Sequence, residues 1–151
     1  MFQELDEVEK KILIELSKNA RISLKELSLR VGLPKSTLFR KIKKLEKDGV
    51  IRKYTICIDE KLLGNNVSAF ILVKIKDVLR LEDFCKSLRD LREIKGVYRI
   101  TGPYNVLLMV SCATIVELNA LIKTLHKKGA VRTVTNIILE KFLEGIELKI
   151  F

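Results

Sequence analysis

A pair of helix signals in the first third of the chain constrains the fold most. Ser23 and Glu26 have the spacing of a capping box, in which each side chain accepts a hydrogen bond from the other residue's backbone N–H. Gly32 ends this short helix, and Pro34, which suits a first helical turn, favours a new helix about three residues later. Gly49 is a typical C-terminal helix signal. The pattern predicts two short helices joined by a tight turn, which is the helix-turn-helix arrangement.

The second of these helices is predicted to be basic on its outer face. Leu38, Ile42 and Leu45 recur at helical spacing and define the inner face. The chain carries 29 basic and 19 acidic residues, and residues 35–53 alone hold eight Lys or Arg against Glu46 and Asp48. A helix fits the major groove of duplex DNA, where basic side chains neutralise phosphates. This concentration favours duplex DNA over a membrane surface or another acidic partner, the alternative being a basic face that is only solvated.

The leading turns of this helix hold the candidates for contact with bases or the groove, and later positions hold the candidates for phosphate contact. The predicted DNA-binding residues are Lys35, Ser36, Thr37, Arg40, Lys41, Lys43, Lys44 and Lys47. Phe39 flanks the apolar stripe, and two roles are open for it: packing in the core or contact with a thymine methyl group.

A third helix and an extended segment complete the predicted N-terminal domain. Apolar residues at helical spacing begin at Leu5, and Asp6 followed by Glu9 gives that helix a capping pattern. Residues 50–58 alternate in polarity as a strand does, which predicts a hairpin after the basic helix. We therefore expect a winged helix-turn-helix domain over residues 1–58, with the helix-turn-helix at about 23–47.

After a linker at residues 59–66, residues 67–151 are predicted to form a second domain. The expected strands are Val67–Ile75, Val97–Thr101, Val106–Cys112 and Val131–Leu139, with a further edge strand over Phe142–Phe151. The expected helices cover about residues 80–92 and the segment after Thr114, which forms a capping pattern with Glu117. The order βαββαβ is that of a ferredoxin-like fold, so the whole chain is predicted to be α+β.

The predicted sheet has helices on one face only, so its other face needs a cover. Residues 106–110 are apolar at every position, which is hard to reconcile with one solvent-exposed side. A second copy of the chain would bury that side, and the C-terminal segment of the same chain is the alternative. We expect a homodimer, because each small domain buries little surface alone.

The sequence lacks the residue groups that catalysis or metal binding would need. It has one histidine, His126, three separated cysteines and no Gly-rich phosphate loop, so we predict no catalytic residue, metal site or cofactor. Each cysteine lies in an apolar context that is typical of a buried thiol. With no apolar stretch long enough to span a membrane and no secretory signal, a cytoplasmic location is expected.

Several motifs together resemble the Lrp/AsnC (feast/famine) family of transcription regulators. They lie at residues 5–13, 19–23, 32–37, 40–51, 59–64, 102–105 and 132–135. The resemblance covers essentially the whole chain and implies a DNA-binding domain followed by an effector-binding and oligomerisation domain. It also implies dimers that assemble further, commonly to octamers, and modulation by a small amino acid.

By position, the resemblance assigns the effector site to Gly102, Tyr104, Asn105, Thr133 and Thr135. The chain departs from the family pattern in this loop, where it has Pro103 and where Asn105 replaces the usual aspartate. A turn and strand hydroxyls without any ligand are the alternative interpretation of these residues.

Two other functions remain open at this point. Sirohaem decarboxylases share the two-domain resemblance, although a single histidine and a strongly basic helix argue against that enzyme. A protein that assembles with other regulators without reading DNA itself is the third hypothesis.

Overall fold

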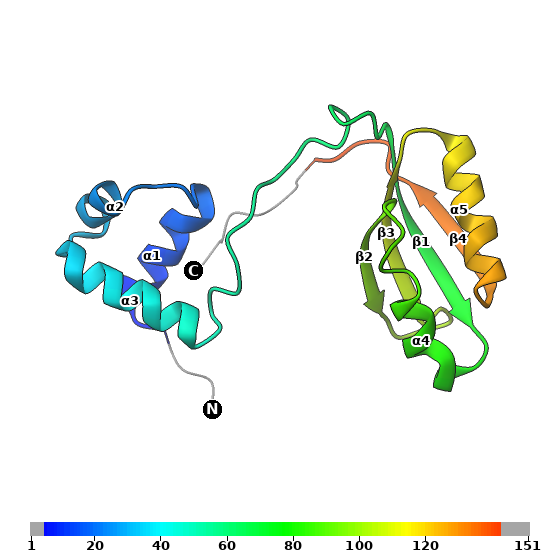
Figure 1. Ribbon diagram of the computed structural model, residues 1–151, viewed down its shortest axis with the longest axis horizontal. Coiled ribbons are helices and arrows are strands. Elements are labelled where there is room, and N and C mark those ends of the chain that lie inside the picture. The colour runs from blue at the N-terminus through cyan, green and yellow to red at the C-terminus, as the bar shows by residue number, and fades with distance from the viewer. Residues whose placement is uncertain (1–4, 143–151) are drawn as a thin grey trace. The chain divides into compact units, whose positions relative to one another are not determined.

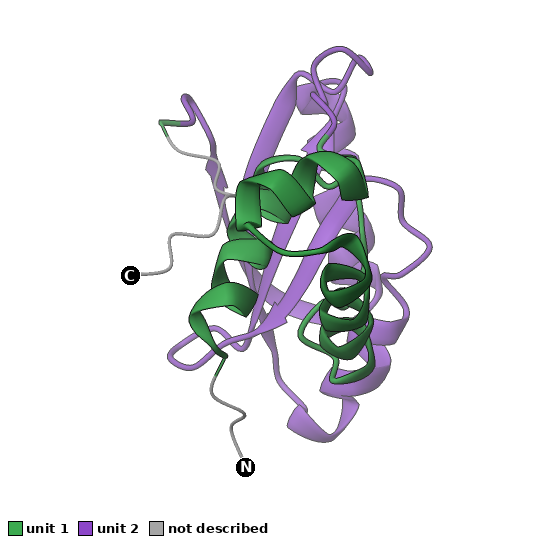
Figure 2. Cartoon of the chain, turned by 90° about the vertical axis from the view of Figure 1, so that its left-hand side faces the viewer, with its two compact units in different colours: residues 1–57, 142–151 green, residues 58–141 purple. Residues whose placement is uncertain are grey.

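The computed structural model describes residues 5–142 of the 151-residue chain. These residues form two compact units, and the division falls in the connecting segment between Cys57 and Ile58 (Figures 1 and 2). The first unit contains three helices, and the second contains a sheet with its helices. Each unit has its own hydrophobic core.

The three helices of the first unit are α1 (Glu7–Lys18), α2 (Leu24–Val31) and α3 (Lys35–Lys47). The capping box predicted for α1 is complete. The Asp6 carboxylate accepts a hydrogen bond from the Glu9 N–H at 2.7 Å, and the Glu9 carboxylate accepts one from the Asp6 N–H at 3.1 Å. Two backbone donors that a helix start leaves unpaired are thereby satisfied.

The other helix ends follow the sequence signals only in part. Ser23 accepts a hydrogen bond from the Glu26 N–H at 3.1 Å, but the Glu26 carboxylate pairs with Arg30 at 2.6 Å rather than completing the box. Pro34 precedes α3 without a side-chain cap. Gly49 follows α3 with a φ of 73°, a left-handed conformation that glycine adopts without strain.

The core of the first unit consists of side chains from all three helices. Its buried members are Ile12, Leu13, Leu27, Leu38 and Leu45. Burial of each such side chain stabilises the unit by about 1.5–3 kcal/mol. The inner face of α3 is therefore fixed against α1 and α2, and its outer face is the one left for a partner.

The strand and hairpin predicted over residues 50–58 are wrong for the chain by itself. No strand is assigned there, and Tyr54, Ile56 and Ile58 are 48%, 73% and 51% exposed. A strand needs a neighbour for its backbone groups, and among residues 5–142 none pairs with this segment.

The second unit is built on four antiparallel strands. They are β1 (Val67–Ile75), β2 (Ile94–Arg99), β3 (Val106–Cys112) and β4 (Ala130–Ile137), in the spatial order β2-β3-β1-β4. Together with α4 (Leu81–Lys86) and α5 (Ile115–Lys127) they give the order βαββαβ, which confirms the ferredoxin-like prediction (Figure 1). A short 3₁₀ helix, η1 (Val78–Arg80), leads into α4.

Several element boundaries differ from the predicted ones. β4 begins one residue earlier and ends two residues earlier than predicted, and β2 ends at Arg99 rather than Thr101. The helix predicted over residues 80–92 ends at Lys86, and β2 begins at Ile94, three residues before the predicted start. The segment between them turns, with the Leu88 N–H bonded to the Cys85 carbonyl at 3.3 Å. The predicted edge strand over 142–151 lies outside the described residues except for Phe142.

The two faces of the sheet have different surroundings. Ala69, Ile71 and Val73 of β1 are fully buried against the helices, as are Val106 and Leu108 of β3. The residues that alternate with them lie on the opposite face, where Phe70 of β1 is the cross-strand partner of Met109 of β3, and Leu72 is that of Leu107. The side chains of Phe70 and Met109 remain 38% and 36% exposed. We call this surface the open face.

A turn over residues 59–64 is anchored to the sheet by Glu60. Its carboxylate accepts a hydrogen bond from Asn65 Nδ2 at 2.6 Å and pairs with Lys95 Nζ of β2 at 3.1 Å. The Asn65 amide and then the Lys95 ammonium hold the pKa of the Glu60 carboxyl below its ordinary value. The connecting chain is thus fixed to the second unit at this turn.

The cysteines are all free, and only one of them is fully buried. Cys112 is buried and Cys85 is half-buried, whereas Cys57 is exposed, so the prediction of a buried thiol is wrong for Cys57. Burial raises the pKa of the Cys85 and Cys112 thiols, which keeps them protonated and unreactive. No group of metal-ligating side chains occurs in the part of the chain that the structure describes.

Candidate nucleic-acid interface

The turn between α2 and α3 is fixed by backbone geometry at Gly32. This residue has a φ of 75°, which a residue with a Cβ adopts only with strain. The N–H groups of Gly32 and Leu33 both bond to the Ser28 carbonyl, at 3.0 and 3.1 Å, and the Ser28 hydroxyl bonds to the Leu33 carbonyl. The turn therefore sets the angle at which α3 leaves α2.

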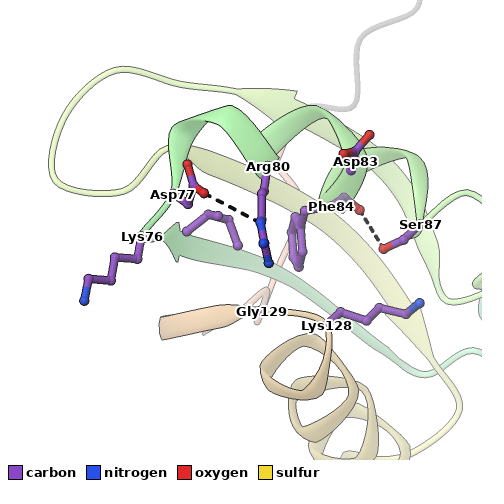
Figure 3. Close-up of a pocket in the computed structure, with 9 residues that line it drawn as sticks. Lys76, Asp77, Arg80, Asp83, Phe84, Ser87, Lys128 and Gly129 are labelled. Carbon is purple, nitrogen blue, oxygen red and sulfur yellow. Dashed lines mark hydrogen bonds and ion pairs between the residues drawn. The ribbon is translucent and has the colours of Figure 1, made fainter.

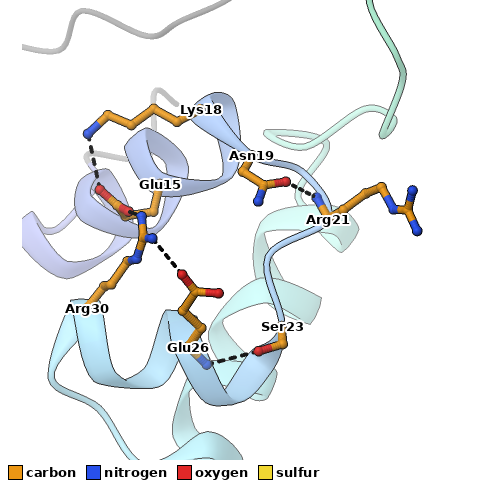
Figure 4. Close-up of polar contacts among 7 residues, drawn as sticks. All are labelled: Glu15, Lys18, Asn19, Arg21, Ser23, Glu26 and Arg30. Atoms are coloured by element: carbon orange, nitrogen blue, oxygen red, sulfur yellow. Dashed lines mark hydrogen bonds and ion pairs between the residues drawn. The ribbon is translucent and has the colours of Figure 1, made fainter.

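A cluster of ion pairs joins α2 to α1 close to this turn. Arg30 of α2 donates to the Glu15 carboxylate of α1 at 2.7 Å and to Glu26 at 2.6 Å, and Lys18 pairs with Glu15 at 3.2 Å (Figure 4). These contacts raise the pKa of Arg30 and lower that of Glu15. Such exposed pairs add little stability each, but together they fix one helix against the other.

Two lysines predicted to bind DNA, Lys41 and Lys44, form ion pairs with α1. Lys41 Nζ lies 2.5 Å from the Asp6 carboxylate and 3.7 Å from Glu9, and Lys44 Nζ lies 3.3 Å from Glu9. Glu9 is 4% exposed, so its charge is compensated largely by these lysines. The pairing with Asp6 raises the pKa of Lys41 and lowers that of Asp6. This flank of α3 holds the helix against α1.

The outward face of α3 carries the remaining predicted side chains. Lys35, Ser36, Arg40 and Lys47 are all exposed, and Thr37 is half-buried. Within residues 5–142, neither Arg40 nor Lys47 has an acidic partner. The structure therefore leaves a cationic strip along α3, formed by Arg40 and Lys47, that no acidic side chain of the described residues neutralises.

Lys43 has local partners on the opposite flank of α3. Its Nζ lies 2.7 Å from the Glu46 carboxylate and 5.8 Å from the centre of the Phe39 ring. Glu46 also accepts a hydrogen bond from the Tyr54 hydroxyl at 3.0 Å. Burial together with this bond raises the pKa of Tyr54 to about 12, and the Lys43 ammonium lowers that of Glu46. Spacing alone did not predict this network.

The predicted effector residues lie in the second unit, in the loop between β2 and β3 and on β4. Gly102, Tyr104 and Asn105 belong to the loop between β2 and β3, and the Tyr104 ring lies 6.0 Å from the Arg132 guanidinium of β4. Thr133 and Thr135 pair across the sheet with Val73 and Ile71, whose side chains face the helices. Thr133 also lies 3.2 Å from His126 Nε2 of α5.

Asn105 is bonded to the end of β1. Its amide accepts a hydrogen bond from the Ile75 N–H and donates one to the Ile75 carbonyl, both at 2.9 Å. The β1–β3 ladder ends at the pair Val73–Val106, so the side chain of Asn105 continues it by one further step. An aspartate could accept the first of these bonds but could not donate the second.

A pocket of about 550 Å³ lies between the start of α4 and the turn before β4. Figure 3 shows Arg80 and Phe84 extending toward the Gly129 turn, with Asp77 bonded to Arg80. None of the five predicted effector residues lines this pocket. The sequence contains no motif that marks it, because its lining combines positions within residues 75–87 with Lys128 and Gly129, about 40 residues further along the chain.

Comparisons with known proteins agree with this two-unit architecture. Residues 5–52 match the model of a winged helix-turn-helix DNA-binding domain, and residues 68–148 match that of the Lrp/AsnC ligand-binding domain. The chain is similar to an uncharacterised helix-turn-helix transcriptional regulator of Pyrococcus furiosus, with 37% identity over 93% of this chain and 95% of the relative. It is also 34% identical to the transcriptional regulator FL11 of the same organism, over 97% of both chains.

A solved structure also resembles the whole chain. It is a transcriptional regulator of Neisseria meningitidis in complex with L-methionine, with a TM-score of 0.90, 28% identity and coverage of 96% of both chains. The fold and the exposed strip of α3 define a DNA-binding transcriptional regulator with a separate ligand-binding domain. The chain belongs to the Lrp/AsnC family.

The described part of the chain contains no helix that is both long and apolar enough to cross a membrane.

Proposed function

We propose that this chain recognises a specific duplex DNA sequence by placing α3 in the major groove. The observation that carries the proposal is the division of charge on α3, where Lys41 pairs with Asp6 and Lys44 with Glu9, while Arg40 and Lys47 have no acidic partner in the described part of the chain. Cations without internal partners are the ones that gain most from phosphate or base contact. Lys35, Ser36 and Thr37 at the leading turn are proposed to approach base edges.

Arg40 and Lys47 are proposed to have different roles. Arg40 lies in the second turn of α3, where a guanidinium can donate two hydrogen bonds to a guanine edge. Lys47 lies in the last turn, where a flexible ammonium suits a phosphate. Arg40→Ala is therefore expected to relax base preference at one position, whereas Lys47→Ala weakens binding to all sequences and reduces the salt slope by about one unit.

The test starts with selection of duplexes bound by the full chain from random DNA, followed by titrations at several salt concentrations. Lys44→Ala is the matched lysine control, because its ammonium is paired with Glu9 and should change the salt slope less than Lys47→Ala does. A selection that yields no preferred sequence would refute the proposal of specific recognition. Equal effects of all three variants on every duplex would refute the division of roles.

We also propose that two copies of the chain associate through the open face of the sheet. Phe70, Leu72, Leu107 and Met109 form adjacent pairs there, and the described residues give them no complete cover. A two-fold dimer would present two α3 helices to half-sites about 34–36 Å apart and would read a roughly palindromic operator. Assembly of dimers into octamers is part of the same proposal.

Met109→Glu tests this interface, because a carboxylate without a partner is costly to bury. Sedimentation analysis should show wild-type dimers or larger assemblies and a shift of the variant toward monomer. Val116→Glu on exposed α5 is the control and should leave the dimer intact. A variant that sediments as the wild type does would count against the open face as the interface.

A small amino acid is the proposed effector of the second unit. Support comes from the match to a ligand-binding domain and from the methionine complex of the Neisseria meningitidis relative. Gly102, Tyr104, Asn105, Thr133 and Thr135 remain its proposed site. The test measures operator affinity and assembly state with L-methionine and then with a panel of amino acids. No change with any member of the panel would contradict the effector proposal.

A further inference from the structure

Phe39 is an exposed aromatic residue on a helix whose outer face is otherwise polar. It lies in the second turn of α3 and is 49% exposed, whereas its neighbour Leu38 is fully buried. The buried core of the first unit does not include it. Core packing therefore does not account for its ring.

The position of Phe39 on α3 places it beside the DNA-binding candidates. Ser36 precedes it by three residues and Lys43 follows it by four, so the three side chains form one row along the helix. Arg40 is its neighbour in the sequence and is also exposed. A helix that enters the major groove with Arg40 toward the bases brings this row to the base edges as well.

The orientation of the ring is stabilised by a chain of contacts. The Lys43 ammonium lies 5.8 Å from the ring centre, within the range of a cation–π interaction. Glu46 holds that ammonium at 2.7 Å, and the Tyr54 hydroxyl holds Glu46 at 3.0 Å. A ring held in this way loses less conformational entropy when it meets a ligand. Lys43 is thus a positioning residue for Phe39.

The chemistry of the major groove limits what such a ring can contact. Base edges there present hydrogen-bond donors and acceptors, and the one apolar group is the C5-methyl of thymine. Docking of a protein usually requires a contiguous apolar patch, but the α3 residues around Phe39 include Lys35, Arg40 and Lys43. The surrounding charge favours nucleic acid.

We infer that Phe39 determines specificity by packing against the methyl group of one thymine in each half-site. The inference rests on the proposed function and deepens it, since it names the base that one side chain reads. Lys43 is assigned to holding the ring rather than to a phosphate.

The test removes single methyl groups from the DNA. Each thymine of a selected operator is replaced in turn by deoxyuridine, which lacks only the C5-methyl, and the affinity of the full chain is measured. The wild type should lose about fourfold at one position of each half-site, the ratio that corresponds to about 0.8 kcal/mol for one buried methyl-sized group. Phe39→Ala should bind the thymine and deoxyuridine duplexes equally.

Further variants separate this role from a general loss of structure. Phe39→Leu keeps an apolar side chain and should retain part of the discrimination, and Lys43→Met should reduce it while Phe39 is still present. Leu29→Ala removes an exposed apolar side chain from α2 and should keep the wild-type profile.

Two results would overturn the inference: a flat deoxyuridine profile for the wild type, or a wild-type profile in Phe39→Ala. Both leave specific DNA binding intact. If the wild type showed no sequence preference at all, the proposed function would be refuted, and this inference with it.

Discussion

Replacement of Asn105 tests the bond between the β2–β3 loop and the end of β1. In Asn105→Ala, the N–H and carbonyl of Ile75 both lose their partner at 2.9 Å. Each hydrogen bond contributes about 1 kcal/mol, and leaving a partly buried backbone group unpaired adds to the loss. We expect the alanine variant to lose about 2–3 kcal/mol of stability in the second unit. Asn105→Asp keeps the acceptor and should lose about half as much.

Hydrogen exchange measured by mass spectrometry on the full chain gives the local readout. A loss of 2 kcal/mol corresponds to about 30-fold less protection in peptides that cover β1 and the loop. Peptides from α1 to α3 should keep their protection, because the first unit has a separate core. Asn66→Asp is the matched control, since its amide makes one exposed bond to the Gly64 carbonyl at 3.2 Å.

The three residues compared at position 105 should differ in a fixed order. Protection should fall from asparagine to aspartate to alanine. If the aspartate variant is as stable as the wild type, the bond that Asn105 donates to Ile75 contributes nothing, and the structural role assigned to its amide is refuted.

Three further predictions concern single residues, namely Gly32, Asp6 and Glu60. Gly32→Ala should lower the stability of the first unit by about 1–2 kcal/mol, measured by thermal unfolding, because alanine would have to adopt a φ of 75°. Lys41 and the Glu9 N–H lower the pKa of Asp6 in the folded state. The ionised Asp6 carboxylate therefore stabilises the fold above about pH 4, and this stabilisation is lost as the pH falls through the lowered folded-state pKa. Asp6→Asn should abolish this part of the dependence of stability on acid pH. Glu60→Gln should increase amide exchange in residues 59–65, because its pairing with Lys95 is lost, and unchanged exchange would show that the anchor is dispensable.

The sequence predicted the strands with continuous apolar runs most accurately. Val67–Ile75 and Val106–Cys112 match the structure end to end, because such runs are limited by polar or turn residues on both sides. The predicted helix over residues 80–92 was too long for a related reason. Leu88 and Leu91 keep helical spacing and contact the core, but the chain there turns by short-range bonds after Lys86.

The roles of the lysines on α3 could not be predicted from spacing. Lys41 and Lys44 lie 35 residues from their partners Asp6 and Glu9, and only the packing of α1 against α3 brings them together. The apolar stripe shows which face of a helix is buried, but it does not show what meets its flanks. The sequence leaves two roles open for Phe39 for the same reason, and its exposure excludes the core.

Because Glu60 anchors the turn at residues 59–64 to the sheet, the connection between the two units has a definite length. The last backbone hydrogen bond of the first unit in this region joins the Ile51 N–H to the Leu45 carbonyl, and the turn begins at Asp59. The seven residues between them span at most about 25 Å when fully extended. An added helical turn of about 34 Å exceeds the span of one such connection. Operators with slightly altered spacers should therefore still be bound, and those lengthened by a whole turn should be bound more weakly.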